Sequence, residues 1–306
     1  MRARLPKPVP RLATAVAVVL AVLTGCGANA HGAPRVTAAA QSPINFITPL
    51  ATAIAPAPQV PFGLPNAALD GMGERLELAV GLAAARGAVA SVAMLDRSTG
   101  QVVANGATTP MAIASVAKLF IADDLLVRGP LSDEDRASLD AMLRSSDDNA
   151  AEEFWNRDGG DEIVTRVAAR YGLTATTPGS DGRWWNVVST PLELVRYYDM
   201  LLGGRGGLDP EQANIIVDNL VQATPTGIDG YPQRFGIPEG LYAEPVAVKQ
   251  GWMCCIGADW MHLSTGVIGA DRRYVLAVGS LQPGDDADAR TTITDVVAAM
   301  FPDGRI

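Results

Sequence analysis

A short apolar helix that carries both a serine and a lysine constrains this chain more than any other segment. Residues 111–126 are rich in Ala, Leu, Ile and Phe, and Gly129 and Pro130 end the segment. Ser115 lies near the expected helix start and Lys118 three residues later, so both side chains project from one face. If its amine is neutral, the lysine can act as the base for the serine nucleophile. Taken alone, the spacing favours an N-capping serine with a solvated lysine, so the other motifs must decide.

The N-terminus has the pattern of an export signal. A basic segment precedes an apolar core at residues 12–22, which is too short to span a bilayer stably. Residues 23–26, Leu-Thr-Gly-Cys, resemble a bacterial lipobox, which implies that Cys26 becomes the first mature residue and carries lipid. The alternative is an ordinary cleavage site with an incidental cysteine. We expect a lipoprotein signal peptide at residues 1–25 and a mature protein anchored in the cell membrane, facing outward.

A tether and one folded domain follow the signal. Residues 26–66 are rich in Ala, Pro, Thr and Gln with almost no charge, which is typical of a semi-extended linker. The domain is expected to span residues 67–306. The chain of 306 residues has a formal net charge of −9 and no dense Lys/Arg face, so no nucleic-acid partner is expected.

The hydrophobic patterns of the domain predict an α+β fold. Strands are expected from both ends of the domain, and an all-helical subdomain, about residues 107–240, is inserted between them. The connections are too short for parallel crossovers, so a sheet of about five antiparallel strands flanked by helices is expected. The terminal elements are helix 69–86, strands 89–95, 101–105, 245–249, 260–267 and 274–281, and helix 289–301.

Two further motifs follow Ser115 and Lys118 in a particular order. Residues 146–148 are Ser-Asp-Asp between two expected helices, and residues 249–252 are Lys-Gln-Gly-Trp at the end of an expected strand. The ordered triple S-x-x-K, S-D-[ND] and K-x-G resembles the penicillin-recognising serine enzymes, namely class A β-lactamases and D-alanyl-D-alanine peptidases, over roughly residues 70–305. The resemblance implies a β-lactamase/transpeptidase-like fold and serine acyl-transfer chemistry.

The resemblance assigns catalytic roles to three residues. Ser115 would attack an acyl carbonyl, and Lys118 would accept the hydroxyl proton. Burial and the nearby cation of Lys249 would lower the pKa of Lys118 and so favour the neutral amine. Ser146 would relay a proton to the leaving nitrogen.

The remaining motif residues are expected to bind substrate. Lys249 would hold the substrate carboxylate, and Asp148 would face the acylamide. Gly251 and Trp252 follow on the same strand, and the backbone N–H of Trp252 would complete an oxyanion hole with that of the nucleophile. Gln250 replaces the usual Thr or Ser and removes a hydroxyl that would face the carboxylate.

Asp148 departs from the family pattern, which usually has an amide at that position. A carboxylate cannot donate a hydrogen bond unless it is protonated. One alternative is that Asn149 substitutes through a local shift, at the cost of the serine. The other keeps Ser146 and alters recognition of the acylamide, and we prefer the register that keeps Ser146.

The loop at residues 174–188 departs in a second way. Class A β-lactamases have a loop glutamate that activates the deacylating water, but Asp181 is the only acidic residue in this segment. Its shorter side chain makes it a poor replacement. Trp184 and Trp185 from this loop, and Arg144, are candidates for the border of the cleft.

Other chemistries have weaker support. His262, the only histidine of the domain, falls within an expected strand and is interpreted as a half-buried structural residue. Metal-ligand spacings are absent from the sequence, so no metal and no cofactor are expected. Cys254 and Cys255 are adjacent, and whether they form a disulfide or remain two buried thiols is left open.

Three hypotheses remain for function. The first is an acylating serine enzyme of the cell envelope that acts on peptidoglycan-like amides, β-lactams or esters. The second is a binding protein, a pseudoenzyme on the same fold. The third, efficient β-lactamase turnover, has the least support because the deacylation base is missing. The expected partners are the lipid bilayer, through Cys26, and peptidoglycan or a small acyl substrate.

Overall fold

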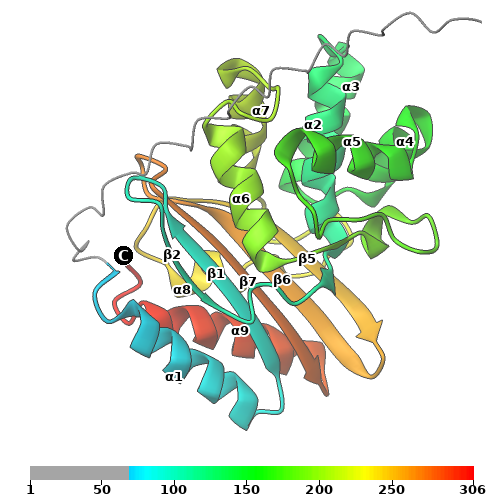
Figure 1. Ribbon diagram of the computed structural model, residues 1–306. Coiled ribbons are helices and arrows are strands. Elements are labelled where there is room, and N and C mark those ends of the chain that lie inside the picture. The colour runs from blue at the N-terminus through cyan, green and yellow to red at the C-terminus, as the bar shows by residue number, and fades with distance from the viewer. Residues whose placement is uncertain (1–68) are drawn as a thin grey trace, which may run out of the picture. The chain divides into compact units, whose positions relative to one another are not determined.

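A five-stranded antiparallel sheet lies at the centre of the part of the chain that the structure, a computed structural model, describes (Figure 1). That part is residues 69–306, so the expected signal peptide, Cys26 and the tether fall outside the described residues. The strand order β2-β1-β7-β6-β5 uses both ends of the domain, and the predicted sheet is confirmed. Its strands are β1 (Val89–Asp96), β2 (Gln101–Asn105), β5 (Val246–Ile256), β6 (Asp259–Ile268) and β7 (Tyr274–Pro283).

The central strands β1, β6 and β7 are covered on both faces. Seven consecutive residues of β7 are buried, which explains its nearly continuous apolar sequence. The edge strand β5 was expected to end at Lys249, before Gly251, but it continues to Ile256. The glycine lies inside the strand because another segment approaches its backbone closely, and not because the chain turns there.

One face of the sheet is covered by the two helices from the ends of the domain (Figure 1). Helices α1 (Met72–Ala85) and α9 (Asp286–Met300) contact each other there, and the short helix α8 (Ile237–Gly240), which the sequence did not predict, packs against α9. The apolar side of α1 has the predicted helical spacing, with buried Met72, Leu76, Ala79 and Ala83.

The opposite face carries the helices that the chain inserts between β2 and β5 (Figure 1). Helix α6 packs against β1 and β7, and α7 contacts β5. Helix α2 lies inside this layer, and its residues 118–126 are all buried. The inserted helices are α2 (Lys118–Val127), α3 (Asp133–Arg144), α4 (Asp148–Asp158), α5 (Asp161–Tyr171), α6 (Pro191–Leu202) and α7 (Pro210–Val221).

A buried carboxylate fixes the position of α2. Asp123 accepts hydrogen bonds from the phenols of Tyr171 (2.5 Å) and Tyr197 (3.2 Å), and it pairs with Arg170 (2.5 Å). A buried carboxylate is tolerated only where such donors surround it, because it has lost its hydration. The helix that begins at Lys118 is therefore held at one depth and one rotation.

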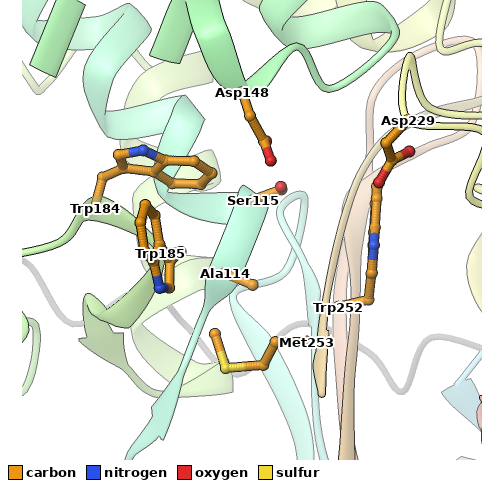
Figure 2. A pocket seen from close by; sticks show the side chains of 8 residues that line it. All are labelled: Ala114, Ser115, Asp148, Trp184, Trp185, Asp229, Trp252 and Met253. Carbon is orange, nitrogen blue, oxygen red and sulfur yellow. The ribbon is translucent and has the colours of Figure 1, made fainter. Parts of the chain in front are cut away.

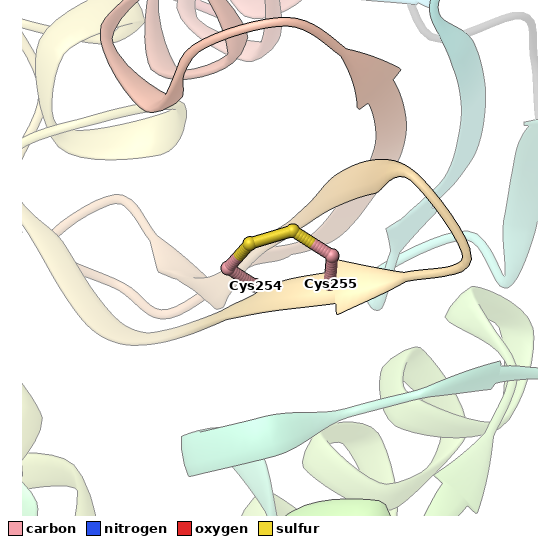
Figure 3. Close-up of a disulfide and its surroundings, with 2 residues drawn as sticks. All are labelled: Cys254 and Cys255. Carbon is pink, nitrogen blue, oxygen red and sulfur yellow. A yellow bond between two sulfur atoms is a disulfide. The ribbon is translucent and has the colours of Figure 1, made fainter. Parts of the chain in front are cut away.

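The β5–β6 hairpin carries a disulfide between adjacent cysteines (Figure 3). Cys254 and Cys255 are bonded, the peptide bond between them is cis, and both residues are exposed. The pairing of β5 with β6 shifts between Met253 and Ile256, where the two cysteines lie. Of the two alternatives that the sequence left open, the structure shows the disulfide.

The end of β1 is held by a buried ion pair. The carboxylate of Asp96 accepts hydrogen bonds from Nε (2.9 Å) and Nη2 (2.7 Å) of Arg273, next to β7, and from the backbone N–H of Ser98 (2.9 Å). The hydrogen bond from Arg273 is the largest of the effects that hold the pKa of Asp96 well below its usual range.

We expect Asp96→Asn to lower the free energy of unfolding by about 2 kcal/mol at pH 7, because it removes hydrogen bonds to a charged group. Since the pKa of Asp96 is lowered in the folded state, its stabilisation is present above the unfolded pKa and is lost as pH falls. Urea titrations at pH 7 and pH 3 should therefore show a smaller loss on acidification in the variant. Asp295→Asn is the control, because its pair with Arg86 is 41–45% exposed. Equal effects of the two variants would contradict the prediction.

Candidate active site

Ser115 lies in a sharp turn that precedes α2. The turn is the 3₁₀ helix Ala114–Ala117, and Ala114 has a left-handed backbone with φ 44°. Strand β5 passes close to this turn: a Cβ on Gly251 would lie 2.5 Å from the carbonyl oxygen of Ile113. Residue 251 must therefore be glycine for the strand and the turn to meet.

The amine of Lys118 is fully buried and lies among four oxygen atoms. Its Nζ is 3.0 Å from Ser115 Oγ, 3.0 Å from Ser146 Oγ and 2.7 Å from the carbonyl oxygen of Ser146. The fourth oxygen is Oδ1 of Asp148, at 2.5 Å. The structure thus brings the first two motifs into direct contact.

The second motif is a short link between α3 and α4. Ser146 adopts a left-handed backbone with φ 59°, which turns the chain between the two helices. Asp147 caps α4 by accepting hydrogen bonds from the backbone N–H groups of Asn149 (2.8 Å) and Ala150 (3.3 Å). Asp148 begins α4 and reaches Lys118, whereas Asn149 is exposed. It is the carboxylate, and not the amide, that stands beside the lysine.

A second buried lysine completes the cluster. Lys249 Nζ lies 2.9 Å from Ser146 Oγ, so this hydroxyl sits between the two amines. Burial lowers the pKa of Lys118, and the neighbouring carboxylate of Asp148 opposes that shift. Burial and then the charge of Lys118 lower the pKa of Lys249 well below its usual range. The cluster therefore disfavours two simultaneous positive charges.

A cleft opens above Ser115 (Figure 2). Trp184 and Trp185 lie on one side of the serine, and Trp252 and Asp229 lie on the other. Asp229 belongs to none of the three motifs and is not among the residues predicted from the sequence. The other lining residues are Ala114, Asp148 and Met253.

Asp229 is brought to the cleft by a loop that docks on the second motif. The backbone N–H of Ile228 donates to the carbonyl oxygen of Ser145 (2.7 Å), and Asp229 accepts from the N–H of Tyr231 (2.9 Å). The loop thus depends on contacts between segments about 80 residues apart, which a sequence pattern does not reveal.

The loop at residues 174–188 places an indole ring beside Lys118. Trp184 is buried, its ring centroid lies 4.7 Å from Lys118 Nζ, and its Nε1 donates to Glu152 (3.1 Å). Asp181 is exposed, accepts from the side chain of Asn186 (2.8 Å), and is not among the residues that line the cleft.

A buried glutamate that lies outside the loop at residues 174–188 holds the first residues of that loop in place. Glu193, in the first turn of α6, accepts hydrogen bonds from Ala175 N (2.9 Å) and Thr176 Oγ1 (2.6 Å). It lies outside residues 174–188, the segment in which the resemblance places the loop glutamate. Glu193 does not line the cleft either, so its role here is structural.

Several candidate residues lie elsewhere. Gln250 points away from the cleft and donates to the carbonyls of Gln233 (3.0 Å) and Phe235 (2.6 Å). Arg144 binds Asn219 and Asp140 and does not line the cleft.

His262 is fully buried, and not half-buried as expected. Its Nε2 lies 2.7 Å from the Tyr231 hydroxyl, and burial lowers its pKa to about 4. Among residues 69–306, no group of three His, Cys, Asp or Glu side chains is arranged to hold a metal ion.

The fold matches that of the class A β-lactamases. The class A β-lactamase of Mycobacterium abscessus is 19% identical, with a TM-score of 0.60 over 74% of this chain and 98% of that chain. The β-lactamase of Streptomyces albus G is also 19% identical, with the same TM-score and coverage. The TLA-3 extended-spectrum β-lactamase is 13% identical, with a TM-score of 0.61 over 76% of this chain and 98% of that chain. At these identities the likeness establishes the fold alone.

Full-length relatives identify the family. The chain is 56% identical to "Putative lipoprotein LppW" of Mycobacterium bovis and of Mycobacterium tuberculosis, over the whole of both chains. No protein-family profile matches it. The chain belongs to the LppW family, whose β-lactamase-like fold the structure shows.

Proposed function

We propose that this protein is a membrane-anchored serine acyl-transfer enzyme of the cell envelope that forms an acyl-enzyme at Ser115. The observation that carries the proposal is one continuous set of polar contacts. It runs from Ser115 Oγ to Lys118 Nζ (3.0 Å), from there to Ser146 Oγ (3.0 Å), and on to Lys249 Nζ (2.9 Å). The proposed base, Lys118, is within hydrogen-bond reach of both the nucleophile and the proton relay.

The proposed acylation follows from these contacts. Neutral Lys118 accepts the Ser115 proton as Oγ attacks the acyl carbonyl. The Ser146 hydroxyl then passes a proton to the leaving group and is replenished by Lys118, while Lys249 orients that hydroxyl. The substrate classes that we propose are peptidoglycan-like amides, β-lactams and esters.

Slow deacylation is the second part of the proposal. In class A β-lactamases the loop that corresponds to residues 174–188 supplies a water-activating glutamate. Here this loop brings the indole of Trp184 next to Lys118, and its one acidic residue, Asp181, faces solvent. Without a general base for water, the acyl-enzyme is expected to persist. Efficient β-lactamase turnover is therefore not part of the proposed function.

We expect a mass adduct on the purified protein after incubation with a penicillin, an acyl-D-Ala-D-Ala mimic or an activated ester. Intact-mass spectrometry would detect it, and Ser115→Ala should abolish it because the nucleophile is removed. An adduct that survives this substitution would show that the nucleophile is wrong. A folded protein that gives no adduct with any of the three would contradict the proposal.

Asp148 is expected to slow acylation, because its carboxylate favours the ammonium form of Lys118. The acylation rate should rise with pH as Lys118 loses its proton. In Asp148→Asn the pKa of Lys118 falls further, so we expect the rising limb to move to lower pH and the rate near pH 7 to increase about tenfold. Stopped-flow rates between pH 5 and pH 10 would measure this. A limb that does not move would show that another group controls the rate.

The ion pair between Asp148 and Lys118 also supports a second candidate function. A lysine held as ammonium at 2.5 Å from a carboxylate cannot accept a proton from Ser115. On that basis the protein would be a binding protein that has retained the fold. A Ser115 adduct would exclude this candidate, and ligand binding without an adduct in both the native protein and Asp148→Asn would favour it.

The membrane anchor is proposed to be lipid on Cys26. The lipobox-like residues 23–26 support it, and so does the lipoprotein name of the LppW relatives. Within residues 69–306 the structure contains no helix with the length and hydropathy needed to cross a bilayer. The lipid would hold the domain at the outer side of the cytoplasmic membrane, within reach of peptidoglycan.

We expect Cys26→Ala to move the protein from the membrane fraction to the soluble fraction of the cell, because the acceptor of the lipid is lost. Fractionation and mass spectrometry of the N-terminal peptide would measure this. Cys254→Ala is the control, since that cysteine lies in the domain. Equal membrane association of the native protein and Cys26→Ala would contradict the anchor.

A further inference from the structure

The cleft above Ser115 is lined by carboxylates and indole rings (Figure 2). Of its eight lining residues, two are Asp, three are Trp, and none is Lys or Arg. The two lysines of the cluster lie behind this surface: Lys118 and Lys249 are 0% and 1% exposed. A ligand in the cleft therefore meets acidic and aromatic groups first.

Asp229 is a fixed carboxylate available to a ligand. It is exposed, and it makes no ion pair with any residue of the described domain. The loop holds it closely, since a Cβ on Gly227 would lie 2.6 Å from Asp229 Oδ1. The other carboxylate of the cleft, Asp148, is paired with Lys118, so Asp229 carries the charge that a ligand can neutralise.

The indole rings present faces that attract cations. Trp252 is stabilised by Tyr231, which stacks on it at 4.7 Å between ring centroids and 7° between planes. Arg183 already lies over the Trp185 ring at 5.2 Å, and Lys118 lies 4.7 Å from the Trp184 ring centroid. Indole faces attract ammonium and guanidinium groups through the ring quadrupole.

A ligand with a free carboxylate fits this cleft poorly. Asp229, the cleft carboxylate without an ion-pair partner in the described domain, would repel it, and Lys249 is directed to Ser146 beneath the surface. The strand offers no hydroxyl at position 250, because that residue is Gln, and its amide donates to the carbonyls of Gln233 and Phe235. This charge pattern opposes the expectation that Lys249 holds a substrate carboxylate. Of the proposed acyl donors, penicillins and D-Ala-D-Ala amides, which carry a free carboxylate, are therefore expected to react more slowly than neutral esters.

We propose that the cleft selects ligands with an organic ammonium group, which Asp229 and the indole of Trp252 bind beside Ser115. The part that concerns acyl donors rests on the proposed function, whereas ammonium binding itself does not. The reaction would transfer the acyl group of such a donor to Ser115 Oγ and release the alcohol, thiol or amine that carries the ammonium.

Three matched thioesters would test the selection on the full-length protein. Acetylthiocholine carries the cation, S-(3,3-dimethylbutyl) thioacetate is its neutral isostere, and S-acetyl-3-mercaptopropionate carries an anion. We expect thiol release to be about tenfold faster for the cation than for the neutral ester, and slowest for the anion. Equal rates for cation and neutral ester would overturn the proposal.

Asp229→Asn would test the residue. We expect the ratio of cationic to neutral rates to fall to about twofold, because only the aromatic attraction remains. Asp181→Asn is the matched control, since that exposed carboxylate does not line the cleft, and it should keep the native ratio. An unchanged ratio in Asp229→Asn would overturn the role of Asp229.

Binding to Ser115→Ala separates this proposal from the proposed function. Calorimetry with choline, its neutral isostere 3,3-dimethylbutanol and the primary amine ethanolamine requires no acylation. Tighter binding of choline than of dimethylbutanol supports the ammonium site even if no thioester reacts, in which case the enzyme proposal alone fails. Tighter binding of choline than of ethanolamine indicates that the site prefers an alkylated ammonium, and the reverse order indicates that it prefers a primary amine. No preference for either cation over dimethylbutanol overturns the site.

Discussion

The contact of two buried lysines with one serine hydroxyl is the constraint on which the site depends. Ser146 Oγ lies 3.0 Å from Lys118 Nζ and 2.9 Å from Lys249 Nζ. Burial lowers the pKa of each lysine, and the charge of Lys118 lowers the pKa of Lys249 further. Helix α2, the α3–α4 link and β5 must all be held in place to maintain this contact. The buried Asp123 holds α2, and the close approach of Gly251 sets β5 against the Ser115 turn.

Asp148 gives this cluster a property that the motifs alone do not suggest. A carboxylate 2.5 Å from Lys118 Nζ offsets part of the effect of burial and favours the ammonium form. Together with Asp229 it also makes the accessible surface of the cleft acidic. Base strength and ligand charge are therefore both influenced by Asp148, which stands where the penicillin-recognising serine enzymes usually have an amide.

Much of the fold follows from local patterns. Helical spacing identified α1 and α9, and apolar runs bounded by turns identified all five strands of the sheet, because these signals depend only on neighbours in the chain. The predicted bounds of an element are wrong where segments that are distant in the sequence meet. The sequence predicts a strand that ends at Lys249, yet β5 continues past Gly251, a glycine that the Ser115 turn requires because it leaves no space for a Cβ.

The sequence by itself determined the fold class, the order of the three motifs and the chemical types of Ser115, Lys118, Ser146 and Lys249, since each is a property of residue identity and spacing. Only the tertiary structure decided which groups touch. The pairing of Asp148 with Lys118, the arrival of Asp229 at the cleft and the disulfide on the β5–β6 hairpin all depend on side-chain positions set by packing. Charges and hydrogen bonds act over a few ångströms, and those separations are fixed only when the whole domain has folded.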